Sequence, residues 1–188
     1  MHSAARRDYA ASVNVTTLWT ERLELVPISV PLVEAVLAGD RARAEAVLGI
    51  PLPGAWPNRA LVERAFYASI EAIRAAPEVR LWGDRVALAR QGARRVVGSV
   101  VFHGAPDEEG AVEVAYGIEE ESQGQGYATE ATRASVVWAL EQPGVRVVRA
   151  ATPPWHLASQ KVLERCGLAR TGERESPLGE LYEYELRR

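Results

Sequence analysis

Hydrophobic and polar residues change their period several times along the first half of the chain. They alternate over residues 18–28, which predicts an opening strand. Helical spacing follows in the segments around 31–48 and 58–75, which the loop PLPGAWP at 51–57 joins. Asn58 is an available N-cap for the second segment. One face of that segment carries Val62, Phe66, Ile70 and Ile73. The chain is therefore expected to open with a strand and two helices.

The second half continues with a meander and then alternates helices and strands. Residues 82–91 and 94–104 flank the turn Gln91-Gly92-Ala93 and predict an antiparallel hairpin, to which 111–119 adds a third strand. The next helix places Tyr127, Ala131, Ala134, Val137 and Trp138 on one arc. A strand at 145–152, a helix at 158–168 ending at Gly167 and an alternating tail, GELYEYELRR, complete the pattern. The predicted order is strand, two helices, three strands, helix, strand, helix, strands.

Length and composition indicate one ordinary globular domain. The 188 residues, 47% hydrophobic and 25% charged, suffice for one substantial core. We expect a flexible arm over residues 1–16, which are polar and alanine-rich, and a single domain over 17–188. The net charge of -3 gives no strong field for attracting nucleic acid or an anionic membrane. Neither is therefore an expected partner.

The sequence also gives expectations for location and metal chemistry. No stretch approaches the roughly 20 continuous apolar residues of a membrane span, and the start lacks the apolar centre of a secretory signal. We therefore expect a cytoplasmic protein. The single Cys166 has no partner for an internal disulfide, and no Cys, His and carboxylate cluster has familiar metal-ligand spacing. No bound metal is expected, and Cys166 is interpreted as a small core residue.

A glycine hinge, QGQGYA at 123–128, joins the third strand of the meander to the next helix. A glycine loop opening a helix leaves backbone N–H groups free at the positive end of the helix dipole, where an anion can bind. Gly124 can take a positive φ, Gly126 allows close approach of a ligand, and Ala128 keeps the first turn small. The hinge lacks the Lys-Ser or Lys-Thr of a P-loop and the third glycine of a dinucleotide fingerprint. On spacing alone, a tight turn entering a packed helix remains the alternative.

The hinge resembles the Q/R-x-x-G-x-G/A signature of the GNAT N-acetyltransferase superfamily. The longer string VEVAYGIEEESQGQGYATEA resembles its ribosomal-protein-alanine N-acetyltransferase-like branch. WTERLEL is similar to the opening T-x-R-L-x-L strand of that branch, and HLASQKVLERCGL to its N-x-x-S-x-x-V-L-E-K-x-G-F segment. The resemblance covers about 18–187, nearly the whole chain. Three matches in the same order favour acyl-CoA binding over a simple turn.

The resemblance implies an α/β (α+β) fold with a mixed, mostly antiparallel sheet of about six to seven strands flanked by helices. This sheet would be splayed between its fourth and fifth strands, and the pantetheine arm of acetyl-CoA would enter there, beside Ile118. The pyrophosphate would lie on the amides of the hinge residues. These are Gln123, Gly124, Gln125, Gly126, Tyr127 and Ala128. Relatives often carry Arg or Lys at the positions of Gln123 and Gln125, so we expect weaker, less salt-sensitive coenzyme binding here.

The reaction implied by the resemblance is direct attack of a primary amine on the acetyl thioester in a ternary complex, with acetyl-CoA as co-substrate. Glu113 matches the family's strand glutamate and is the candidate base, with a surface carboxylate or ion-pair partner as the alternative. Glu119 and Glu120 belong to a run of three acidic residues that reads as solvated. Ser159, at the branch's serine position, would hydrogen-bond the leaving thiolate, with helix capping as its alternative role. The tyrosine that many relatives use for this purpose is replaced by Leu163.

The acceptor is the least specified part. His156 stands where relatives usually carry Asn, and it either replaces that contact with the pantetheine arm or marks a rebuilt loop. Gly117 replaces a bulky residue of the branch and would widen the acceptor cavity. Aromatic residues that could line this cavity are Trp56, Phe66, Tyr116, Trp155 and Tyr182. The acceptor would be a peptide N-terminus or a small-molecule amine. A coenzyme-binding sensor without turnover is the alternative function, and the strand EYEL with the N-terminal arm could support a homodimer.

Overall fold

The computed structural model describes residues 13, 15–55, 70–177 and 179–188. The strands are β1 (Leu18–Trp19), β2 (Leu23–Pro27), β3 (Arg85–Ala89), β4 (Arg95–Phe102), β5 (Ala111–Ile118), β6 (Val147–Thr152), β7 (Ala169–Ser176) and β8 (Gly179–Arg187). The helices are α2 (Val30–Leu37), α3 (Arg41–Leu48), α5 (Ile70–Ala75), α6 (Pro77–Arg80), the 3-10 turn η1 (Glu120–Ser122), α7 (Tyr127–Glu141) and α8 (Leu157–Arg165). The predicted residues Asn58, Val62 and Phe66 lie outside the described part of the chain.

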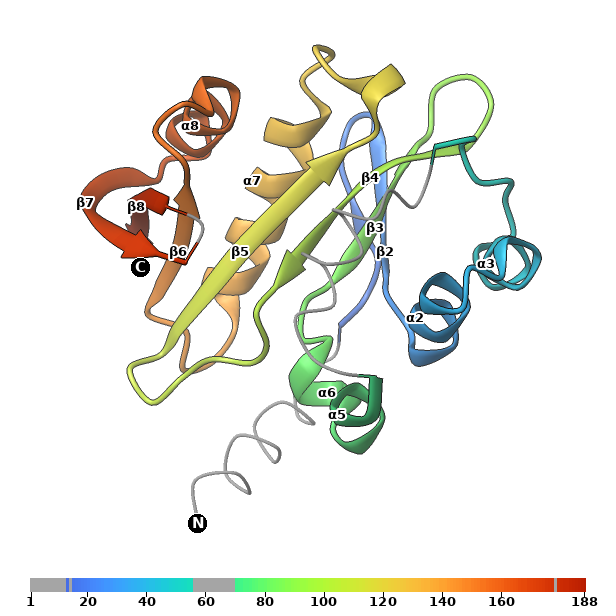
Figure 1. Ribbon diagram of the computed structural model, residues 1–188, viewed down its shortest axis with the longest axis horizontal. Helices are drawn as coiled ribbons and strands as arrows, with labels where there is room; N and C mark the ends of the chain where they lie inside the picture. Colours follow the sequence, from blue (N-terminus) through green and yellow to red (C-terminus); the bar gives the residue numbers. More distant parts are fainter. Residues whose placement is uncertain (1–12, 14, 56–69, 178) are drawn as a thin grey trace.

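The described strands form one mixed sheet in the order β1-β2-β3-β4-β5-β6-β8-β7 (Figure 1). Every neighbouring pair is antiparallel except β5 and β6, which are parallel. One face of the sheet packs with α7 and with Leu163 of α8, and the other with α2 and the buried residues Ala44 and Ile73. This arrangement confirms the predicted mixed α/β fold.

The sheet has eight strands rather than six to seven, because the expected opening strand is two strands. Thr20 turns the chain between them, since its amide N–H and its hydroxyl both reach the Leu23 carbonyl oxygen, at 3.0 and 3.4 Å. The segment around 31–48 is likewise divided. Gly39 has φ +67°, and Asp40 then caps α3 by accepting a hydrogen bond from the Arg43 amide at 3.0 Å. Neither break alters the hydrophobic period, so the pattern gave no sign of it.

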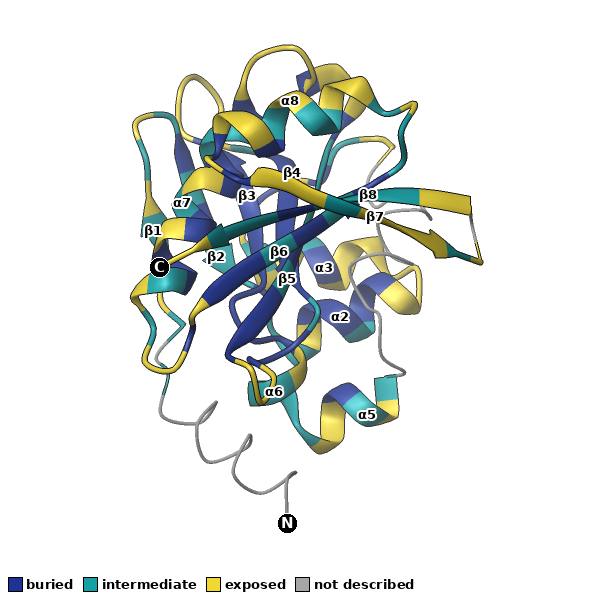
Figure 2. Ribbon diagram, turned by 90° about the vertical axis from the view of Figure 1, so that its left-hand side faces the viewer, coloured by how far each residue is buried: buried dark blue, intermediate teal, exposed yellow. Residues whose placement is uncertain are grey.

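The extent to which each residue is buried shows where the core lies (Figure 2). Strands β3 and β4 are buried along almost their whole length, as expected for the centre of a sheet covered on both faces. Strand β7 is mostly exposed and forms one edge. The predicted apolar arc of α7 is correct except at Val137, which is 51% exposed, because the buried stripe runs through Val136 instead.

The first described residues pack against the core. Val13 and Val15 contact the cluster that includes α7, and the Thr16 carbonyl oxygen accepts a hydrogen bond from the buried Arg85 guanidinium at 3.2 Å. The chain is therefore anchored at Val13, Val15 and Thr16, shortly before β1.

Candidate active site

The parallel strands β5 and β6 separate after a short paired stretch. Ala111–Glu113 pair with Val147–Arg149, and β5 then continues to Ile118 without a partner strand on that side among the described residues. Strand β6 remains paired with β8 up to Thr152. Figure 1 shows the two strands diverging toward their carboxyl ends. The predicted splay is present, between the fifth and sixth strands in the observed numbering because β1 adds one.

The direction of the backbone groups of β5 follows from its contacts with β4. The Glu113 carbonyl accepts from His103 N and the Glu119 amide donates to the Val97 carbonyl oxygen, both at 2.9 Å. In a strand both polar groups of a residue point to one side, and that side alternates. The amides and carbonyls of Tyr116 and Ile118 therefore face the gap, where an extended ligand can pair with them.

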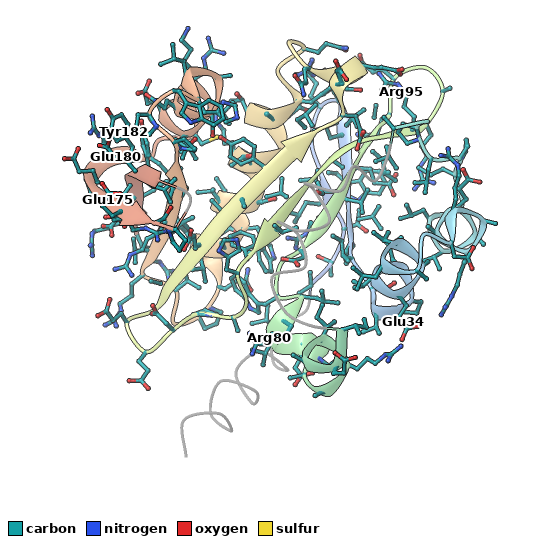
Figure 3. All side chains as sticks on the ribbon, in the orientation of Figure 1. Glu34, Arg80, Arg95, Glu175, Glu180 and Tyr182 are labelled. Atoms are coloured by element: carbon teal, nitrogen blue, oxygen red, sulfur yellow. The ribbon has the colours of Figure 1, made fainter. Side chains whose placement is uncertain are left out.

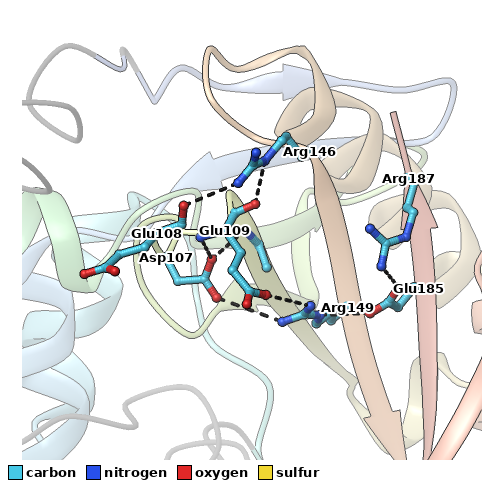
Figure 4. Close-up of polar contacts among 8 residues, drawn as sticks. Asp107, Glu108, Glu109, Arg146, Arg149, Glu185 and Arg187 are labelled. Atoms are coloured by element: carbon cyan, nitrogen blue, oxygen red, sulfur yellow. Dashed lines mark hydrogen bonds and ion pairs between the residues drawn. The ribbon is translucent and has the colours of Figure 1, made fainter.

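The opposite end of the gap is held closed by ion pairs and backbone contacts (Figure 4). Arg146 Nε donates to the Glu109 carbonyl at 2.6 Å, and the Arg146 amide donates to the Gly110 carbonyl at 2.8 Å. Arg149 of β6 contacts Glu109 at 3.2 Å and Glu185 of β8 at 2.9 Å. Because these contacts fix the amino end of β5 to β6, only the carboxyl end is open.

The glycine loop lies where β5 leaves the gap and α7 begins. Gly124 and Gly126 have φ of +73° and +84°, and Gly126 is the N-cap of α7 without a side-chain cap. The first bond of α7 runs from the Glu130 amide to the Gly126 carbonyl, so the amides of Tyr127 to Thr129 have no acceptor within the helix. The hinge thus has the backbone conformation of an anion site at a helix N-terminus.

The two glutamines of the hinge hydrogen-bond to the loop itself. Gln123 Nε2 donates to the Ile118 carbonyl oxygen at 3.1 Å, and Gln125 Nε2 donates to the Glu121 carbonyl oxygen at 3.3 Å. Gln123 therefore connects the loop with the last residue of β5, which is also a predicted coenzyme contact. In this conformation both side chains support the shape of the loop.

Positive charge beside the loop comes from Arg22, which the sequence interpretation did not include as a site residue. Arg22 Nη1 donates to the Gln125 carbonyl at 2.9 Å, and its guanidinium pairs with Glu130 of α7 at 2.6 Å. Thr20 also donates to Glu130, at 2.5 Å. Burial would raise the pKa of Glu130, but the hydrogen bonds from Thr20 and Arg22 outweigh it and lower the pKa. Thr20 and Arg22 of the WTERLEL motif thus contact α7, and Arg22 also contacts the loop. This motif was the sequence signal for the contact.

A second arginine lies at the same end of the sheet (Figure 3). Arg95, the first residue of β4, donates from Nη1 to the Ser122 hydroxyl at 2.6 Å, just before the glycine loop. Nothing in the sequence pattern pairs these two residues, because the contact depends on how β4 and η1 meet in space.

Ser159 faces β5 from the first turn of α8. The N-cap of this helix is His156, so the alternative that Ser159 caps it does not hold. The Ser159 hydroxyl lies 2.8 Å from the Tyr116 hydroxyl, which is also 3.0 Å from the Ser159 carbonyl oxygen. Burial raises the pKa of Tyr116 to about 12 despite this contact, so the phenol is protonated at neutral pH. Two hydroxyls thus bridge the strand that borders the gap and the helix beyond it.

The surroundings of three other residues in and next to α8, His156, Leu163 and Cys166, are also defined. The His156 ring stacks on Trp155 with 5.4 Å between ring centroids, and its side chain makes no cap bond. Leu163 is buried in the core and has no polar group to offer the coenzyme. Cys166 is buried as predicted, and burial raises the pKa of its thiol to about 11. Such a thiol is unreactive at neutral pH.

Glu113 lies at the last paired position before the strands separate. Its carboxylate is 3.6 Å from His103 Nδ1 and 3.7 Å from Arg174 Nη2. The His103 contact lowers the pKa of Glu113 against the effect of burial, and Arg174 lowers it further. Glu113 is therefore ionised at neutral pH, and it also has the ion-pair partners of the alternative interpretation.

Glu119 corrects the interpretation of the acidic run. It is only 4% exposed, whereas Glu120 and Glu121 are exposed as expected. Its Oε1 is buried without a hydrogen-bond partner among the described residues. Burial, with a smaller contribution from the charge of Glu121, raises the pKa of Glu119 from 4.5 to about 7. This carboxyl group is two residues beyond Gly117, on the same side of the strand.

The predicted aromatic lining of an acceptor cavity is only partly described. Trp56 and Phe66 lie outside the described residues. Tyr116 contacts Ser159, Trp155 is 75% exposed against His156, and Tyr182 lies beneath the Arg170 guanidinium at 3.3 Å. These three residues have separate partners, so their contacts do not define one acceptor pocket.

A mixed sheet that opens between two parallel strands, next to an amide-lined glycine loop at a helix N-terminus, is the arrangement expected of a protein that binds an acyl-CoA. The chain belongs to the GNAT acetyltransferase family, whose model "Acetyltransferase (GNAT) domain" matches residues 22–169. It is thus an N-acetyltransferase by family, and acetyl-CoA is the co-substrate that the family implies.

One curated relative agrees with this assignment, and two solved structures share the fold. The chain is 31% identical over 150 residues to the Uncharacterized N-acetyltransferase YjdG of Bacillus subtilis (strain 168), covering 80% of this chain and 88% of that protein. A GNAT-family acetyltransferase from Bacillus anthracis has the same fold with a TM-score of 0.61 and 18% identity, covering 91% of this chain and 98% of that one. RimL, a ribosomal L7/L12 alpha-N-protein acetyltransferase solved with coenzyme A, has a TM-score of 0.58 and 18% identity, covering 89% and 95%.

The described residues also bear on membrane and metal binding. Among the described residues, none of the helices has the length and apolar character needed to cross a membrane. Within that same part of the chain, no group of three or more His, Cys, Asp or Glu side chains is placed to hold a metal ion.

Proposed function

We propose that this protein transfers the acetyl group of acetyl-CoA to a primary amine, either the N-terminal α-amine of a protein or the amine of a small molecule. The observation that carries the proposal is the gap between β5 and β6, which opens directly onto the glycine loop of α7. A pantetheine arm in the gap would pair with the backbone of Tyr116 and Ile118, and its diphosphate would meet the amides of Gly124–Ala128. Arg22 beside the loop supports this placement by adding positive charge.

The reaction needs no protein nucleophile. A neutral amine held beside the thioester attacks the acetyl carbon, and the enzyme acts chiefly by placing the two reactants together. An α-amine, with a pKa of about 8, loses its proton far more readily than a lysine of about 10.4. A carboxylate reached through water would therefore suffice as the base.

Two carboxylates are candidates for that base. We retain Glu113, which is ionised and lies where the strands separate. Glu119 is the rival because its pKa of about 7 suits a proton acceptor near neutral pH. If Glu113 is the base, Glu113→Gln lowers kcat by about tenfold or more without changing the KM for acetyl-CoA. A kcat loss confined to Glu119→Gln would instead assign the role to Glu119.

Ser159 is proposed as the hydrogen-bond donor to the departing thiolate. Its hydroxyl is held at the start of α8, across from the strand that borders the gap, which supports the role. Ser159→Ala is expected to lower kcat more than it weakens acetyl-CoA binding. Equal losses in both quantities would indicate a purely structural residue.

The decisive test of function is release of coenzyme A thiol with a panel of amines, including peptides that start with alanine or serine. An amine that multiplies thiol release above the rate without acceptor identifies the substrate class. A sensor without turnover would bind acetyl-CoA, as shown by a thermal shift, and release no thiol with any amine. His156 is assigned to contact the pantetheine arm, and His156→Ala with unchanged acetyl-CoA affinity would remove it from the site.

The remaining expectations are a cytoplasmic protein, a domain over 17–188 and the capacity to form a homodimer. The EYEL segment belongs to β8, which is paired on both sides, so strand addition between copies would use the edge strand β7 or β1. Light scattering after size exclusion tests the dimer. Limited proteolysis tests whether the first residues form an exposed arm.

A further inference from the structure

Tyr116 and Ser159 form a hydroxyl pair that connects the edge of the open gap with α8. The two oxygens are 2.8 Å apart, and either can be the donor. The phenol has a second acceptor, the Ser159 carbonyl oxygen at 3.0 Å. A phenol has one proton, so it can satisfy either the carbonyl or the Ser159 hydroxyl at one time.

The choice between these two acceptors decides what the Ser159 proton can do. When Tyr116 donates to the carbonyl, the Ser159 hydroxyl donates to the phenol oxygen and is not free for a ligand. When Tyr116 donates to the Ser159 hydroxyl oxygen, the Ser159 proton is released toward the gap. A chain of two hydroxyls is also a stronger donor than one, because each bond polarises the next.

We propose that Tyr116 is a positioning residue that donates its proton to the Ser159 hydroxyl oxygen and so directs the Ser159 proton onto the coenzyme A sulfur. This inference rests on the proposed function, since it needs the thioester in the gap beside Ser159. It places a phenol on β5 next to Ser159, whereas the helix position that the resemblance aligns with a tyrosine is the buried, apolar Leu163.

The bond changes balance without an additional reactant. The amine nitrogen forms a bond to the acetyl carbon, and the carbon–sulfur bond breaks with its electron pair remaining on sulfur. The base takes the proton that the amine loses, and solvent returns one proton to the thiolate after release. Tyr116 and Ser159 keep their own protons and stabilise the negative sulfur by hydrogen bonding. The protonated state of the buried phenol at neutral pH agrees with this role.

The test uses the full chain with coenzyme A and needs no knowledge of the acceptor. The pKa of the bound thiol is read from thiolate absorbance in the ultraviolet during a pH titration. A hydrogen-bond chain to the thiolate is expected to increase the acidity of the bound thiol relative to free coenzyme A by about tenfold or more. Tyr116→Phe should remove most of that increase and should leave the Kd for acetyl-CoA within about twofold.

Two further variants separate positioning from structural damage. Tyr184→Phe removes a phenol oxygen from a buried tyrosine of β8 and should leave the thiol acidity at the wild-type value. Adding Tyr116→Phe to Ser159→Ala should cause no further loss, because Tyr116 acts through Ser159. Fully additive losses would contradict that route.

The outcomes distinguish the two levels of the proposal. Normal coenzyme binding with a wild-type thiol no more acidic than free coenzyme A refutes this inference alone, whatever the variants do. The same holds if folded Tyr116→Phe retains the acidity of the wild type. Absence of coenzyme binding by the wild type refutes the proposed function and this inference with it.

Discussion

The buried carboxyl group of Glu119 predicts a specific dependence of stability on pH. Its pKa is raised from 4.5 to about 7 in the folded protein, chiefly by burial. A group with a raised folded pKa favours the native state while it is protonated. The contribution is full below pH 4.5 and is lost as the pH rises through about 7. Ionised Glu119 therefore destabilises the native state at alkaline pH.

The magnitude follows from the two pKa values. A change from 4.5 to about 7 corresponds to about 3 kcal/mol of unfolding free energy between the acidic and alkaline limits. Glu119→Gln removes the titration and nearly conserves the shape. Its unfolding free energy relative to wild type should therefore improve by about 2–3 kcal/mol from pH 5 to pH 8, because the rest of the change occurs below pH 5.

Urea unfolding of both proteins at several pH values measures this difference. Glu120→Gln is the matched control, because Glu120 is the exposed neighbour in the same acidic run. Its effect should stay constant over the same pH range. A difference between Glu119→Gln and wild type that does not change with pH would refute the reasoning from burial.

Three further predictions concern the walls of the site. Gly98→Ala should destabilise the fold by about 1–3 kcal/mol and weaken coenzyme binding, because the new Cβ would lie 2.2 Å from the Gly117 carbonyl oxygen and displace β5. Urea unfolding measures the loss of stability, and titration calorimetry measures the loss of coenzyme affinity. Gly126→Val should raise the Kd for acetyl-CoA far more than Gly92→Val, which imposes the same positive-φ strain in a turn away from the loop. Equal Kd values for the two variants would show that the hinge is not part of the coenzyme site. Arg22→Met should weaken coenzyme binding by about tenfold in calorimetry and reduce its dependence on salt, because the loop loses its neighbouring charge.

The sequence predicted elements where a hydrophobic period persists. Strands β3 to β6 and helices α7 and α8 lie where the period indicated, because each buries a regular stripe or both faces. The two-residue β1 is too short to show a period, and the break at Gly39 leaves the apolar spacing on both sides intact. The resemblance to the GNAT family supplied the parallel pairing of β5 and β6, which no local pattern encodes.

The site was predictable where it is made of backbone and much less so where side chains meet. The glycine loop follows from Gly124 and Gly126, since their positive φ is a local property. The contact between Tyr116 and Ser159 joins residues 43 positions apart and depends on where α8 lies relative to β5. Glu119 was misjudged because acidic neighbours suggest solvent, whereas its side chain is buried at the end of β5.

A crystal structure of the protein with coenzyme A tests the central claim most directly. We predict that the diphosphate lies against the amides of Gly124–Ala128 and that the pantetheine amides pair with Tyr116 and Ile118, with the sulfur next to Ser159. Coenzyme A bound elsewhere, with the space between β5 and β6 closed by side chains, would contradict the account.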